Sequence, residues 1–229
     1  MEPYKIDPYL ISLDRFFELT VSKQLIPSRI ALGEMISERF RIIKDSGIQS
    51  LGALHKILKS KKSVQAFASR SGIPEMYLVL LKREAGSYLA RPFPLSGFPG
   101  IPHEYVEVLK SREIRNTREF FESAQTSEQQ MKLSLRTGIP VARLQEILSL
   151  SDLSRITGIG GVFARIVYES GIRSVEQFAR TDGADQYEKY MAIIEKHKYP
   201  AGHFAKEDIQ YCIDYAMVIM ECCKNSDPS

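Results

Sequence analysis

The sequence predicts an all-α protein, built from about three tandem helical modules of roughly sixty residues each, behind an N-terminal helical cap. Short motifs recur at this interval, and the apolar residues around them follow helical spacing. Residues that favour helix N-caps stand at matching positions in the copies. No stretch shows the sustained period-two alternation that a strand requires, so we expect no sheet.

Two motifs define the repeat. "SGIP" at Ser71–Pro74 recurs as "TGIP" at Thr137–Pro140 and, more weakly, as "HKYP" at His197–Pro200. "KDSGIQS" recurs as "KSREIRN" and "YESGIRS", which aligns three isoleucines. These anchors are Ile48, Ile114 and Ile172. The spacing from each anchor to the next motif proline is nearly constant, so each repeat predicts one supersecondary unit.

A helix is expected before each anchor. Its buried side holds a pair of apolar residues five and six positions upstream. The pairs are Ile42 and Ile43, Val108 and Leu109, and Ile166 and Val167. Gly47 and Gly171 close two of these helices as left-handed C′ residues. Glu113 takes the place of that glycine in the middle copy, so its turn must differ or be strained.

A second helix is expected after each anchor, with Ser50, Asn116 and Ser174 as N-caps. Glu119 and Gln177 follow two of these caps by three residues and predict capping boxes. Three apolar residues stand one turn inside: Leu54, Phe120 and Phe178. The next helix in each module ends with an inward residue, namely Phe67, Leu133 and Ile193. Pro74 and Pro140 then start another helix, whose apolar stripes are Leu78 with Leu81 and Leu144 with Ile147.

These elements suggest four segments. Residues 1–35 form an N-terminal capping segment, followed by modules at 36–98, 99–157 and 158–229. Four aromatic or apolar residues of the capping segment are expected to cover the open end of the array: Tyr9, Leu10, Phe16 and Phe17. The proline-rich stretch Gly86–Pro102 is the expected joint, and the tail "CCKNSDPS" is expected to fray.

Composition narrows the function classes. The 229 residues carry 31 basic and 28 acidic side chains, a net charge of +3 that argues only weakly for a nucleic-acid partner. No apolar run is long enough to span a bilayer, and the start lacks the pattern of a signal peptide. Three clustered cysteines make no disulfide framework, so we expect a cytoplasmic protein.

The stretch Ile156–Ala179, "ITGIGGVFARIVYESGIRSVEQFA", resembles a helix-hairpin-helix motif. The motif's pattern falls on Ile156, Gly158, Ile159, Gly160 and Ala164. The longer stretch Arg136–Ala179 looks like an uncharacterised family of helix-hairpin-helix-like domains, the domain of unknown function 4332. At module level the resemblance extends from about Arg41 to Met217. It implies a fold and leaves the function open.

In DNA-binding members of the wider motif, the hairpin offers backbone N–H groups to a phosphate. The resemblance then implies a turn at Gly158 and Gly160, and N–H donors at Gly161 and Val162. Arg165, one turn into the helix, and Arg155, just before the turn, would add charge. Such contacts would bind DNA without sequence preference.

This chain also departs from the motif. Val162 and Phe163 are apolar where DNA-binding hairpins often carry a cation. The earlier copy at Gly97–Ile101 is interpreted as a structural corner, because nearby prolines remove donors and nearby glutamates repel phosphate.

A second basic region lies between Arg41 and Arg70, where Asp45 is the single acid. Lys59, Lys61 and Lys62 are its candidate phosphate contacts, and a solvated helix face is the alternative interpretation.

No catalytic constellation is recognised, so we expect a protein that is not an enzyme and needs no cofactor or metal. The four histidines are scattered among the modules. Asp152, the carboxylate nearest the glycine corner, is interpreted as a helix-start residue. Two hypotheses remain: sequence-independent DNA binding through the phosphate backbone, and a protein–protein interaction scaffold whose hairpins only pack the modules together. The oligomeric state stays open.

Overall fold

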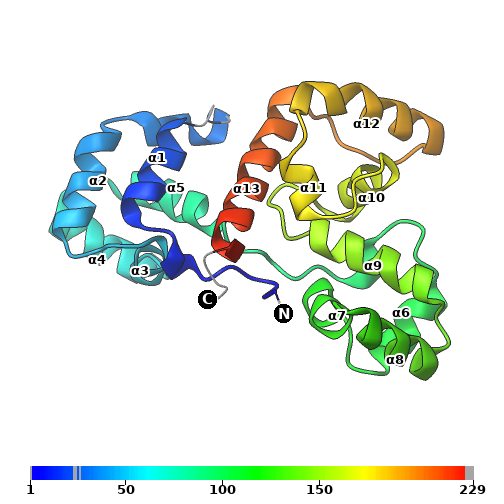
Figure 1. Cartoon of the computed structure of the whole chain (residues 1–229). Coiled ribbons are helices and arrows are strands. Elements are labelled where there is room, and N and C mark those ends of the chain that lie inside the picture. Colours follow the sequence, from blue (N-terminus) through cyan, green and yellow to red (C-terminus); the bar gives the residue numbers. More distant parts are fainter. Residues whose placement is uncertain (1, 23–24, 26, 225–229) are drawn as a thin grey trace. The chain divides into compact units, whose positions relative to one another are not determined.

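The computed structural model describes residues 2–22, 25 and 27–224, and its regular structure is helical (Figure 1). Among the described residues, β-type pairing is limited to two isolated bridges, Ser12 with Ser50 and Pro94 with Asn116. The all-α prediction is therefore confirmed. Residues 6–89 make up one compact unit, and residues 2–5 with 90–223 make up the other. The division between residues 89 and 90 falls inside the proline-rich stretch expected to be a joint.

In the described part of the unit of residues 6–89, seven helical elements follow one another. They are η1 (Pro8–Leu10), α1 (Leu13–Ser22), η2 (Pro27–Gly33), α2 (Ile36–Asp45), α3 (Leu51–Ile57), α4 (Lys61–Ser71) and α5 (Glu75–Gly86). α5 lies against α3, α4 and η2, while α1 lies against α2 and η1 against α3. Phe16, Ile43, Leu54 and Leu78 are completely buried between these helices and form the centre of the core.

The other unit begins its helices after the proline-rich stretch. They are η3 (Leu95–Gly97), α6 (His103–Lys110), α7 (Thr117–Ser123), α8 (Ser127–Thr137), α9 (Val141–Leu153), α10 (Gly161–Glu169), α11 (Val175–Ala179), α12 (Gly183–His197) and α13 (Lys206–Lys224). α9 is central, because α7, α8, α10 and α11 all lie against it (Figure 1). α10 also lies against α12. Phe120, Leu144, Ile147 and Phe178 are completely buried here.

The three predicted N-caps are confirmed. The side-chain oxygens of Ser50, Asn116 and Ser174 accept backbone N–H groups two or three residues on, at the starts of α3, α7 and α11. The predicted capping boxes are wrong in detail. Glu119 and Gln177 bond the N–H groups of the residues before the caps, Arg115 and Arg173, at 2.6 and 2.7 Å.

Complete capping boxes form where the sequence analysis did not expect them. Ser60 with Ser63 opens α4, and Thr126 with Gln129 opens α8. Each pair satisfies two N–H groups that a helix start would otherwise leave without a partner.

The turns after α2, α6 and α10 are left-handed, as expected at the glycines. Gly47 and Gly171 have φ of +84° and +101°. Glu113 adopts the same conformation with φ of +65°, so the middle turn keeps its shape at a steric cost that glycine avoids. Pro74 and Pro140 occupy N-cap positions after left-handed Gly72 and Gly138. The number of repeats stays a prediction.

Most of the expected core is buried, with some corrections. Ile43, Leu109, Ile166 and Val167 are 0% exposed, whereas Ile42, Val108 and Ile193 are only half-buried. Of the four residues expected to cover the end of the array, Phe16 is 0% exposed and Phe17 half-buried, whereas Tyr9 and Leu10 are exposed at 54% and 43%. Of the tail expected to fray, Cys222–Lys224 belong to α13, and residues 225–229 lie outside the described part.

Candidate functional site

The glycine corner connects α9 to α10. Gly158 has φ of +91°, which the turn needs, and Ile156 and Ile159 on either side of it are buried. Gly160 is the N-cap of α10 and makes no side-chain bond to the helix. Gly158 and Gly160 are exposed. Gly158 and Gly160 therefore lie in an exposed turn between the two helices.

One side of this corner is closely packed. A Cβ on Gly161 would lie 2.2 Å from the carbonyl oxygen of Gly97 and 2.7 Å from the ring of Phe93. A Cβ on Gly158 would lie 2.7 Å from Sγ of Cys212. Gly161 is buried and Val162 half-buried. Gly158 and Gly161 therefore permit close approach of neighbouring segments, which is a packing role.

Arg165 faces inward from α10. Its Nη1 lies 2.6 Å from a Glu146 carboxylate oxygen, and its Nε donates to the carbonyl of Pro99 at 2.7 Å. The side chain is 5% exposed. Arg143 also pairs with Glu146 and donates to the carbonyl of Gly100 at 2.8 Å. These arginines tie the proline-rich stretch to α9 and α10.

Arg155 is also internal. It lies 2.6 Å from the Glu2 carboxylate and 2.7 Å from that of Asp152, and it donates to the carbonyl of Tyr4 at 3.1 Å. Burial alone would lower the pKa of Arg155, but the two carboxylates outweigh it and raise the pKa above its usual value. The guanidinium thus stays charged and holds the N-terminal segment in place.

Asp152 does not lie at the start of its own helix, as the sequence analysis supposed. It belongs to the last turn of α9. Val175 is the first residue of α11, and its backbone N–H donates to the second carboxylate oxygen of Asp152 at 2.8 Å. Asp152 therefore stabilises the start of a different helix, a relationship that depends on the tertiary fold.

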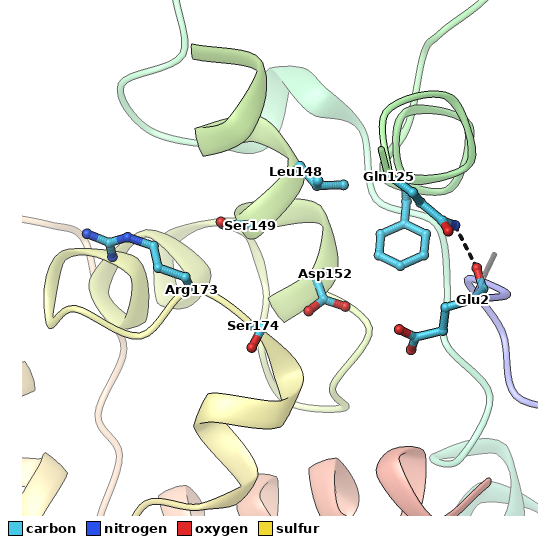
Figure 2. Close-up of a pocket in the computed structure, with 8 residues that line it drawn as sticks. Glu2, Gln125, Leu148, Ser149, Asp152, Arg173 and Ser174 are labelled. Atoms are coloured by element: carbon cyan, nitrogen blue, oxygen red, sulfur yellow. Dashed lines mark hydrogen bonds between the residues drawn. The ribbon is translucent and has the colours of Figure 1, made fainter. Parts of the chain in front are cut away.

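A cavity of about 270 Å³ lies beside Asp152. It is lined by Glu2, Phe121, Gln125, Leu148, Ser149, Asp152, Arg173 and Ser174. Figure 2 shows the carboxylates of Asp152 and Glu2 pointing toward one another across the space, with Arg173 away from both. Both carboxylates already bind Arg155, and the Arg173 guanidinium lies 3.8 Å from the Tyr168 ring centroid. Internal partners thus occupy the charged groups of this cavity.

A second cavity, the basic groove, lies in the unit of residues 6–89. It measures about 680 Å³ and is formed by η1, α3 and α4. Its lining consists of Tyr9, Ala53, Lys56, Ile57, Lys59, Ser63, Phe67 and Arg70. Lys56, Lys59 and Arg70 are exposed, and no acidic residue is among the lining. The groove therefore presents three cations to solvent.

Further positive charge surrounds the groove. Lys61 and Lys62 are exposed on the first turn of α4, which contains no acidic residue. The Lys82 ammonium donates to the carbonyl of Lys59 at 2.6 Å, so another cation lies at this edge. Lysines at a helix N-terminus are unfavourable, because the positive end of the helix dipole repels them. The clustered lysines therefore destabilise the helix start, and a bound anion would offset this repulsion.

Tyr9 contributes an aromatic ring to the groove. A Cβ on Gly52 would lie 2.7 to 2.9 Å from three ring carbons, so the ring rests directly on the backbone of α3. The residue nevertheless remains 54% exposed. From the sequence, Tyr9 was expected to cover the open end of the array, and only the cations of this groove were recognised as candidate contacts. Gly52, a glycine in the first turn of a helix, was the available signal for close approach.

The predicted site residues thus separate into groups. Gly158, Gly160, Gly161 and Val162 form the corner, whereas Arg155 and Arg165 point into the protein beside it. Lys59 lines the basic groove, and Lys61 and Lys62 lie next to it on α4. The described residues contain no group of three side chains suited to a metal. Within the same residues, no helix is long and apolar enough to cross a bilayer.

Comparison with models of protein families gives a match over part of the chain. A family model described as "Domain of unknown function (DUF4332)" matches residues 99–216. These residues include the glycine corner, while the basic groove lies outside them. No curated protein and no solved structure matches the chain.

Proposed function

We propose that this chain, which belongs to the DUF4332 family, is a non-catalytic module that binds nucleic acid through phosphate contacts. The description of that family names no activity, so the proposal rests on the surface of the protein. The basic groove is the proposed site. The observation that carries the proposal is three exposed cations, Lys56, Lys59 and Arg70, lining one cavity without a carboxylate. Phosphate contacts of this kind supply most of the affinity in sequence-independent binding.

A nucleic acid fits the groove better than an acidic peptide would. The groove combines cations with the exposed aromatic ring of Tyr9, the pairing typical of surfaces that bind backbone and bases together. Lys61 and Lys62 extend the positive surface along α4, as a chain of phosphates requires. No helix with base-reading side chains is recognised, so we expect low sequence preference.

The test is fluorescence anisotropy of labelled DNA at low salt, followed by a salt titration. We expect dissociation constants on the order of micromolar that rise steeply with salt, because each phosphate contact releases counterions. Lys56→Ala and Lys59→Ala should each weaken binding uniformly across sequences and reduce the salt slope by about one.

Lys189→Ala is the matched control, since Lys189 is an exposed lysine on α12 in the other unit. It should leave both affinity and slope unchanged. Equal loss in the control and the groove variants would mean that overall charge, and not the groove, drives binding. No binding at low salt by the folded protein would rule out the proposal.

The second candidate is a protein–protein interaction scaffold. The contacts of the glycine corner support it, because Gly161 packs against Gly97 and Arg165 pairs with Glu146 inside the protein. On this interpretation the hairpins only join helices. The absence of nucleic-acid binding, in a protein shown to be folded, would leave the scaffold as the favoured function. A cytoplasmic location is part of either proposal, because the three cysteines, all within the described residues, form no disulfide, which suits a reducing compartment.

A further inference from the structure

Building on the proposed function, we infer that the basic groove takes single-stranded nucleic acid, with one base stacked on Tyr9 and the neighbouring phosphates on Lys56, Lys59 and Arg70. The juxtaposition of an exposed ring and three cations in one cavity carries this inference.

The ring of Tyr9 is held in place while it stays accessible. Gly52 lets it lie against the backbone of α3, with three ring carbons inside the distance that a Cβ would need. The N–H of Tyr9 donates to the Asp7 carboxylate at 2.9 Å, which fixes the short η1 turn that carries the ring. A ring fixed on one side and open on the other can stack a base at little entropic cost.

The rest of the groove suits the sugar–phosphate backbone. Lys56 and Lys59 lie on α3 and just after it, while Arg70 projects from α4. The Arg70 guanidinium lies 5.3 Å from the Phe67 ring centroid, a cation–π contact that orients it. The Ser63 hydroxyl is already bonded to Ser60 in the capping box, so the cations provide the principal phosphate contacts.

A duplex would make poor use of Tyr9. Its bases are stacked on each other and only the phosphates and groove edges face outward, so the ring would find no free base face. A single strand exposes base faces, and stacking on an aromatic side chain is tolerant of sequence. The groove should therefore prefer single strands, and the preference should depend on the ring.

The experiment compares a labelled oligothymidylate of about 12 nucleotides, within the usual range for single-strand sites, with a duplex of equal length. The variants are Tyr9→Leu, which removes the ring but keeps an apolar residue, and Tyr9→Phe, which keeps the ring. Tyr9→Leu should lose about 10-fold in affinity for the single strand, whereas Tyr9→Phe should retain most of it. Duplex binding should be weaker and should not change in either variant.

Circular dichroism must show that the variants are as helical as the wild type. If Lys56→Ala weakens binding but Tyr9→Leu does not, the inference fails while the proposed function survives. Equal affinity of the wild type for single strand and duplex would likewise overturn the inference alone. If neither DNA binds, both fail.

Discussion

Arg165 and Glu146 form an ion pair inside the unit of residues 90–223, with a nitrogen–oxygen distance of 2.6 Å and side-chain exposures of 5% and 8%. The residues come from α10 and α9, the helices that flank the glycine corner. The cation that the motif resemblance assigns to a phosphate thus already has a carboxylate partner. We therefore expect Arg165 to contribute to the free energy of unfolding and not to DNA affinity.

Arg165→Ala should therefore lower the free energy of unfolding, by about 3 kcal/mol, because it leaves the buried Glu146 carboxylate short of one partner. Urea denaturation followed by circular dichroism measures this loss. DNA affinity at temperatures where the variant is folded should not change. A stable variant with a shallower salt slope would instead place phosphate at Arg165.

Removing both charges separates the loss of the ion pair from the cost of leaving a buried carboxylate short of a partner. Arg165→Met with Glu146→Leu should recover a large part of the stability lost in Arg165→Ala, since well-packed apolar residues often replace a buried pair without cost. Arg143 also loses its carboxylate partner in this double variant, so the recovery should be incomplete. A double variant as unstable as the sum of the single changes would mean that the pair does not interact.

The glycine corner offers a matched pair of substitutions. Gly161→Ala should destabilise the protein by about 1–3 kcal/mol, because the new Cβ would meet the carbonyl of Gly97 at 2.2 Å and backbone must shift. Gly160→Ser should be neutral or slightly stabilising, since no atom lies within 4 Å of its Cβ and serine is a good N-cap. Thermal melts compare the two.

The difference in stability between the two variants tests whether Gly161 is required for close packing. Similar losses at both positions would show that Gly161 has no special contact. Gly160→Glu then becomes a clean functional probe, because Gly160 is exposed and its φ of −82° suits any residue. On our proposal it should leave DNA binding unchanged, whereas a phosphate at the corner would make it abolish binding.

Local signals in the sequence account for what could be predicted. The N-caps at Ser50, Asn116 and Ser174 bond backbone groups within three residues, so the local sequence is enough to predict them. The left-handed turns at Gly47 and Gly171 are predicted by the glycine alone. The spacing of apolar residues predicted most of the core, because residues that recur with the helical period lie on the face of the helix that is buried.

Long-range contacts account for what could not be predicted. Arg165 reads as a surface cation until Glu146, nineteen positions away, is placed beside it. Asp152 reads as a cap for its own helix, yet it binds the N–H of Val175. Tyr9 reads as a residue that covers the end of the array, because Gly52, on which its ring rests, lies far from it in the sequence.

The N-caps give a further test. Asn116→Ala and Ser174→Ala should each cost about 1 kcal/mol, because each removes the acceptor for N–H groups at a helix start. Ser69→Ala is the control. Ser69 is exposed within α4 and bonds back to the Gln65 carbonyl, so alanine there should be neutral or slightly stabilising. Equal effects at all three positions would argue against specific capping.

Cys212 links the corner to α13 and predicts a pH effect. Burial, together with the negative charges of Asp208 and Asp214, raises the pKa of its thiol from 9.0 to about 12. The unfolded chain therefore loses this proton first as the pH rises above 9, while the folded protein keeps it. Proton linkage then favours the unfolded state, so the stability contributed by the neutral thiol is complete below pH 9 and is lost between pH 9 and about 12.

Urea denaturation of the wild type and Cys212→Ala across this range isolates the contribution of Cys212. Other groups, Cys223 among them, have pKa values raised in the same direction, so only the difference between the two proteins is informative. The variant starts less stable, because it loses packing against Gly158, but its stability should fall less steeply above pH 9. Parallel pH profiles would show that the thiol ionises alike in both states. Alkylation gives an independent check: Cys212 should resist iodoacetamide in the folded protein and react once it is unfolded, because the thiolate is the reactive form.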